Sequence, residues 1–167
     1  MKSTLAAFLL LASICQLNAQ NTQLPEFNDK PAYYHAKDKK LVELEKSQYN
    51  TLAKAKGIFK AEAGFFLNGT TSPVKISIQE ELKFIVKVAE GVDPTSVFDL
   101  AKFEIRDNKR VLITAKANAT SSTNSLTKIN YSIEKIKDGY YYLVVKELDK
   151  GEYFFGSSQF MFAFSIE

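Results

Sequence analysis

Hydrophobic and polar residues alternate along most of the chain with a period of two. Residues 59–67 place phenylalanine, alanine and leucine at alternate positions, with Lys60 and Glu62 between them. The same alternation recurs in residues 74–78, 82–88, 101–105, 111–115, 129–133 and 160–166. Successive side chains of a strand point to opposite faces, so this period indicates strands with one buried and one solvated face. The pattern predicts an all-β fold, a single antiparallel β-sandwich of about ten strands.

Helical spacing is confined to one short interval and one turn. Near residues 46–56, Tyr49, Leu52 and Ala53 fall on one helical face and Ser47 is a candidate cap. We expect at most one short helix there, and a loop with a helical turn is an equal alternative. A single helical turn is also expected at Pro94, where the preceding aspartate can act as the cap.

The N-terminal residues 1–19 have the layout of a secretory signal peptide. Lys2 is followed by an apolar run over residues 5–14 and by a small-residue end at Ala19. The run is too short for a permanent membrane span, so no transmembrane segment is expected in the mature chain. Cys15 is the only cysteine; we do not expect it to carry a lipid anchor, since isoleucine precedes it. The sequence therefore predicts a secreted protein, periplasmic or extracellular, with a flexible leader over 20–30 and a β-sandwich domain over 31–167.

The charge balance argues against nucleic acid as a partner. The chain has 22 Lys and Arg against 19 Asp and Glu, and no dense basic run. Nucleic-acid surfaces need a concentrated basic patch. A solvated, nearly neutral surface is the simpler interpretation.

A short motif near the C-terminus carries a family resemblance. Leu148, Gly151 and Tyr153 have the spacing L-x-x-G-x-Y, which resembles the tyrosine corner of immunoglobulin-like and fibronectin type III-like Greek-key sandwiches. The resemblance implies that the Tyr153 hydroxyl returns to upstream backbone and pins the crossing between two sheets. An ordinary hairpin turn that contains a tyrosine is the alternative. The chain is also similar to small secreted proteins of Gram-negative bacteria with a GEY-[AF]-F C-terminal hairpin, a similarity that implies no activity.

Catalytic residues, metal ligands and cofactors are not expected. His35 is the only histidine, so a Ser-His-Asp or Cys-His system would have to use it, and no mature cysteine remains as its partner. Zinc sites need several Cys or His ligands, and no acidic loop has the spacing of a calcium-binding EF-hand. A hydrolase built on two carboxylates stays an alternative, because the sequence ranks none of the possible pairs.

Exposed tyrosines are the candidate binding residues. Tyr140 and Tyr142 share one face of a predicted strand, and Tyr33 with Tyr34 forms a second candidate set. The alternative is that these rings are covered by a second sheet and a loop. The sequence thus predicts an exported, non-enzymatic binding module whose partner is a protein or glycan at the cell envelope. A carbohydrate-binding or adhesion module that uses these tyrosines is the first alternative.

Overall fold

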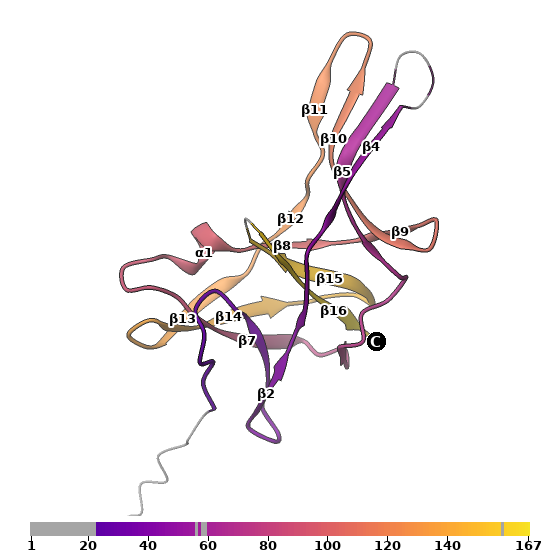
Figure 1. The fold of residues 1–167 in the computed structure, drawn as a ribbon. Coiled ribbons are helices and arrows are strands. Elements are labelled where there is room, and N and C mark those ends of the chain that lie inside the picture. Colours follow the sequence, from indigo (N-terminus) through magenta and orange to yellow (C-terminus); the bar gives the residue numbers. More distant parts are fainter. Residues whose placement is uncertain (1–22, 56, 58–59, 158) are drawn as a thin grey trace, which may run out of the picture.

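The part of the chain that the structure describes forms three β-sheets and one short helix (Figure 1). The computed structural model describes residues 23–55, 57, 60–157 and 159–167. This part contains sixteen strands, all paired antiparallel except for one short parallel pair, and the helix α1 (Pro94–Val97). The predicted all-β class is confirmed, while the predicted signal peptide over 1–19 lies outside the described residues.

Two sheets face each other and form the predicted sandwich. Sheet A contains, in spatial order, β13 (Ser132–Lys137), β14 (Tyr140–Lys146), β7 (Glu81–Lys87), β1 (Ala32–His35) and β2 (Lys40–Glu43). Sheet B contains β12 (Lys128–Ile129), β8 (Asp99–Lys102), β15 (Gly151–Gly156), β16 (Met161–Ile166) and β3 (Glu45–Ser47), with β6 (Lys75–Ile76) parallel to β16. Between the sheets, the Phe84 ring lies 4.9 Å from the Phe155 ring and 5.0 Å from the Phe164 ring. This aromatic core holds the two sheets together.

A third sheet covers the outer face of sheet B and then extends away from it. Sheet C contains β11 (Ser122–Asn124), β10 (Lys109–Asn118), β5 (Lys60–Asn68) and β4 (Asn50–Ala55), and β9 (Glu104–Arg106) also pairs with β10. At its base, Leu67 and Leu112 pack with Phe154 and Met161 of sheet B in a second core. Sheet B is therefore the middle of three layers, which explains why β16 is buried along its whole length. Figure 1 shows the far half of sheet C as a projecting arm.

The arm departs from the sandwich at an irregular point in the β5–β10 pairing. The register shifts between Ile113 and Ala115, which leaves Thr114 as an extra residue. Opposite this bulge lies Gly64, where an added Cβ would come within 1.9 Å of the Leu112 carbonyl oxygen. A bulge bends and twists a strand, and glycine permits this close backbone approach.

On the arm side of Gly64, sheet C carries alanines on the same face that packs against sheet B at its base. Ala63 pairs with Ala53 on one side and with Ala115 on the other. The sequence predicted a buried face along the whole of 59–67, but Ala61 and Ala63 are exposed. The prediction holds at Leu67, which is buried, and at the half-buried Phe65. It fails at Ala61 and Ala63, because the strand extends beyond the layer that would cover it; Phe59 lies outside the described residues.

Residues 46–55 contain neither the short helix nor the loop with a helical turn that were equal alternatives for this interval. This interval contains β3 and β4, and Asn50–Ala55 pairs residue by residue with β5. Tertiary pairing overrides the weak helical pattern here. The single turn at Pro94 is confirmed, since the Asp93 side chain accepts a hydrogen bond of 2.8 Å from the Thr95 backbone amide.

The segment predicted as a flexible leader is held against sheet A where the structure describes it. The Asp29 backbone amide donates to the Lys87 carbonyl at 2.8 Å, and the Lys87 side chain donates to the Glu26 carbonyl at 3.0 Å. Residues 26–29 therefore lie alongside the end of β7.

The structure contains the hydrogen bond that a tyrosine corner at Tyr153 would make. The Tyr153 hydroxyl donates to the Asp149 carbonyl at 2.8 Å, and Leu148 and Tyr153 are both buried. Gly151 has a φ of +154°, a conformation that disfavours residues with a Cβ. Kinship with immunoglobulin-like or fibronectin type III-like domains stays a prediction.

Candidate functional site

An apolar crevice lies between the outer face of sheet B and the base of sheet C. Its floor comes from sheet B, and one wall comes from Phe65 and Leu112 of sheet C. The floor residues are Ala101, Phe154 and Met161. All three floor residues are almost fully buried. The crevice has a volume of about 280 Å³.

Two aromatic rings form the rim of this crevice. Tyr49 lies where the chain crosses from β3 to β4, and its ring centroid is 4.5 Å from that of Phe65 at an interplanar angle of 62°. This edge-to-face contact is a favourable geometry for two aromatic rings. Leu126, in the connection that returns from the arm, completes the rim. Both rings are half-buried, so a molecule in the crevice would contact them.

The lining of the crevice is mostly apolar, as in small-molecule sites, whose volumes run from about 300 to 1,000 Å³. Its volume of about 280 Å³ lies just below that range. Asp99 is the acidic side chain that lines the crevice, and it pairs with Lys128 at 2.7 Å. The hollow therefore offers apolar contact area with few polar groups.

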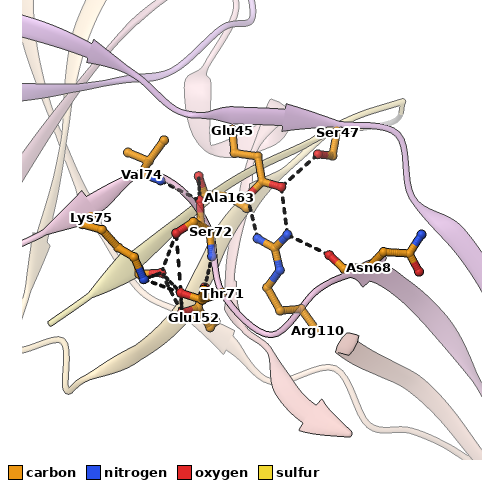
Figure 2. A network of polar contacts seen from close by, with 11 residues as sticks. Glu45, Ser47, Asn68, Thr71, Ser72, Val74, Lys75, Arg110, Glu152 and Ala163 are labelled. Atoms are coloured by element: carbon orange, nitrogen blue, oxygen red, sulfur yellow. Dashed lines mark hydrogen bonds and ion pairs between the residues drawn. The ribbon is translucent and has the colours of Figure 1, made fainter. Parts of the chain in front are cut away.

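A buried ion pair fixes the base of the arm to sheet B (Figure 2). The Arg110 side chain is 2% exposed, and its guanidinium donates to both Glu45 carboxylate oxygens at 2.6 and 2.8 Å. It also donates to the Asn68 carbonyl at 3.2 Å. Burial would raise the pKa of Glu45, but hydrogen bonds and the charge of Arg110 outweigh it, so this pKa lies below its ordinary value. The pair is bidentate and links β3 to β10.

A second polar cluster lies beside this ion pair (Figure 2). The Glu152 carboxylate accepts from the Thr71 hydroxyl at 2.8 Å, the Ser72 backbone amide at 2.8 Å and the Ser165 hydroxyl at 2.6 Å. The Lys75 ammonium lies 3.3 Å from the Ser165 hydroxyl, an arrangement known from serine-lysine nucleophiles. Ser165, however, is 1% exposed and already hydrogen-bonded to Glu152. We interpret the cluster as a structural link between strands of sheet B.

Three of the four predicted tyrosines share the outer face of sheet A. The ring centroids of Tyr34 and Tyr142 are 5.8 Å apart. Strand register places Tyr140 on the same face as Tyr142, two residues along β14. All three side chains are half-buried. The sequence prediction thus brings these residues together on one surface.

Lysines lie over two of these tyrosine rings, and the fourth tyrosine is elsewhere. Lys83 lies 5.3 Å from the centroid of the Tyr142 ring, and Lys137 lies 4.8 Å from that of Tyr140. Tyr33 is 5% exposed, and its hydroxyl accepts a hydrogen bond of 3.0 Å from Gln79. Tyr33 as an exposed binding residue is wrong, because it points into the sandwich core.

Within the described residues, no cluster of three or more His, Cys, Asp or Glu side chains is suited to a metal ion. His35 lies at the end of β1, with Nδ1 3.1 Å from the Asp38 carboxylate. Where the chain is described, it has no helix of the length and hydrophobicity that a membrane crossing needs.

Sequence reasoning missed the crevice because its residues come from distant segments. Residues 49, 65, 101, 112, 126, 154 and 161 all line it. One signal was present: the segments around Phe154 and Met161 are apolar on both faces, which is typical of a strand covered on two sides. Comparison with protein-family models, curated proteins and solved structures finds no significant match.

Proposed function

We propose that this chain is an exported binding protein without enzymatic activity, and that the apolar crevice is its ligand site. The observation that carries the proposal is the hollow of about 280 Å³ with an apolar floor and an aromatic rim. Export rests on the signal peptide predicted over residues 1–19. The ligand class that fits is a small apolar group such as an alkyl chain, since the crevice holds only about 280 Å³ and is poor in polar partners.

Binding of an alkyl chain has a characteristic energetic signature. Burial of one methylene contributes about 0.8 kcal/mol, which corresponds to roughly fourfold in the dissociation constant. Among octyl, decyl and dodecyl glycosides, affinity should rise by this factor per methylene and level off once the crevice is full. The neutral sugar head keeps charge out of this comparison.

Filling the floor of the crevice should weaken this binding. Ala101 is fully buried under the floor of the hollow, so the extra carbons of Ala101→Leu push the floor residues into the hollow. We expect decyl glucoside to bind at least about tenfold more weakly, because the displaced floor occupies the ligand's volume. Stability should fall by about 1–3 kcal/mol, the usual cost of enlarging a core residue. Isothermal titration calorimetry and urea unfolding measure the two quantities.

The matched control is Ala163→Leu. Ala163 belongs to the same second core and is fully buried, but it does not line the crevice. Overpacking there should cost about 1–3 kcal/mol while the folded fraction still binds decyl glucoside. Equal binding by wild type and Ala101→Leu would contradict the crevice as the ligand site.

The tyrosine face of sheet A supports a second candidate function, a carbohydrate-binding or adhesion surface. The contact between Tyr34 and Tyr142 and the position of Tyr140 on the same face favour it. Aromatic rings with a polar tip suit contacts that are partly apolar and partly wet. Binding on a glycan array that disappears in the Tyr140→Ala/Tyr142→Ala variant would support this function. A blank array with the wild-type protein would remove it.

A further inference from the structure

The projecting arm has an open strand edge along one side. β4 pairs with β5 over its whole length, and no described strand pairs with its other side. Five of its six residues are exposed, and Leu52 is half-buried. An open edge presents a row of backbone N–H and C=O groups with which another strand can pair. The free edge of β4 is therefore a candidate docking surface.

The other edges of the three sheets have features that prevent such pairing. Within the described residues, the edge strands β3, β6, β9, β11 and β12 are only two or three residues long. β2 carries a charge at each end, Lys40 and Glu43. β13 is as long as β4, but it carries three charges and an irregular register between Lys135 and Lys137. β4 has one charge, Lys54, no proline and a continuous register with β5.

The sequence of β4 suits antiparallel pairing with a second copy of itself. With Leu52 opposite the Leu52 of the second copy, Lys54 lies opposite the second copy's Asn50. The two lysines are then four residues apart along the strand, about 13 Å. A register centred on Ala53 makes the lysines diagonal neighbours at about 7–8 Å, and an in-register parallel pair places them side by side. Charge repulsion therefore favours the antiparallel register centred on Leu52.

The contacts in this register are compatible on both faces of the arm. On the outer face, each half-buried Leu52 gains the other as an apolar neighbour. On the alanine face, Thr51 lies opposite the second copy's Ala53, so that no charged group is involved. On its own chain Lys54 lies 3.9 Å from the Asp107 carboxylate, with side chains 60% and 85% exposed. An ion pair this exposed is weak, so Lys54 is free to meet a second copy.

We propose that two copies of this chain associate through β4, in antiparallel pairing centred on Leu52, so that sheet C continues across a twofold axis. Backbone hydrogen bonds between the two strands supply the affinity, as in other cases of strand addition. Because the contact is confined to one strand of each copy, the dimer is weak and its population depends on protein concentration. The inference does not rest on the proposed ligand.

The register predicts opposite effects for two substitutions at the exposed Asn50. Asn50→Glu places a carboxylate opposite the second copy's Lys54, and the twofold axis makes this pair occur twice. We expect the dimer to dissociate about fivefold less readily, as two cross-strand charge pairs should give. Asn50→Lys places like charges opposite each other and should weaken the dimer by about the same factor. Sedimentation equilibrium at protein concentrations up to the millimolar scale measures the dissociation constants.

Thr123→Glu is the matched control, because it adds the same charge at an exposed position of β11, the opposite edge of the arm. It should leave the dissociation constant unchanged. In a Lys54→Gln background, Asn50→Glu should no longer strengthen the dimer, since its partner charge is gone. Wild-type protein that is monomeric at every concentration would overturn the proposal. Equal strengthening by Thr123→Glu, or by Asn50→Glu without Lys54, would show a general charge effect and overturn the pairing through β4.

Discussion

Gly64→Ala will destabilise the protein by about 3 kcal/mol or more, at or beyond the upper end of the usual cost of overpacking. An added Cβ would lie 1.9 Å from the Leu112 carbonyl oxygen and 3.0 Å from the Ile113 Cα. Both atoms are backbone, so no side-chain rotation can relieve the clash. β10 has to move away from β5, and the second core between sheets B and C opens with it. Urea unfolding followed by circular dichroism measures the loss.

Gly69→Ala provides the comparison for Gly64. Gly69 has a φ of +82° and no atom within 4 Å of an added Cβ, so its substitution costs only backbone strain of about 1–2 kcal/mol. The loss at Gly64 should clearly exceed the loss at Gly69. Equal losses would mean that the close approach of β5 and β10 does not determine where the arm leaves the sandwich.

Removing Arg110 alone should be nearly as damaging. The Arg110→Met variant leaves the Glu45 carboxylate, 19% exposed, next to an apolar side chain without its bidentate partner. Breaking a buried pair in this way costs about 3–5 kcal/mol. The free energy of unfolding, measured by urea titration near neutral pH, gives the loss directly.

The double variant Glu45→Leu/Arg110→Met separates charge from packing. Replacing both partners by apolar residues removes the stranded charge, so the double variant should recover to within about 1 kcal/mol of wild type or exceed it. A double variant as unstable as the sum of its two single variants would show that the side chains act independently. The ion pair would then not be the link between β3 and β10.

Alternation predicted the sandwich because burial depends mainly on which face a residue occupies. Phe84, Phe162 and Phe164 were placed on inward faces by period two, and all three lie in the main core. The turn at residues 106–109 was also predicted, and Asp107 and Asn108 adopt the positive φ values of 49° and 57° that a tight hairpin turn needs. At these positions the local sequence was sufficient to predict the structure.

The arm could not be predicted, because its alternation is the same as that of a covered strand. Ala61 and Ala63 follow the pattern of Phe65 and Leu67, yet only the second pair lies over sheet B. Whether a strand face is covered depends on where the covering layer ends, which is a property of the whole fold. The short helix or helical turn expected near residues 46–56 is absent from the described residues for a related reason: pairing of β4 with β5, not local spacing, determines the structure there.

The crevice could not be predicted from the sequence, for the same physical reason. The tyrosines could be proposed from sequence because Tyr140 and Tyr142 are neighbours on one strand face. The crevice joins Phe65 and Leu126 of sheet C and its return connection to Ala101 of sheet B. Only the stacking of the third layer brings these segments together.

The methyl group of Met161 provides the most direct test that the crevice binds an alkyl chain. The chain has two methionines, Met1 and Met161, so removal of the predicted signal peptide leaves the one on the crevice floor. In protein labelled with ¹³C-methyl methionine, we predict a single resonance that shifts saturably with decyl glucoside and stays unchanged in Ala101→Leu. A Met161 resonance unmoved by the probe in wild-type protein would contradict the account.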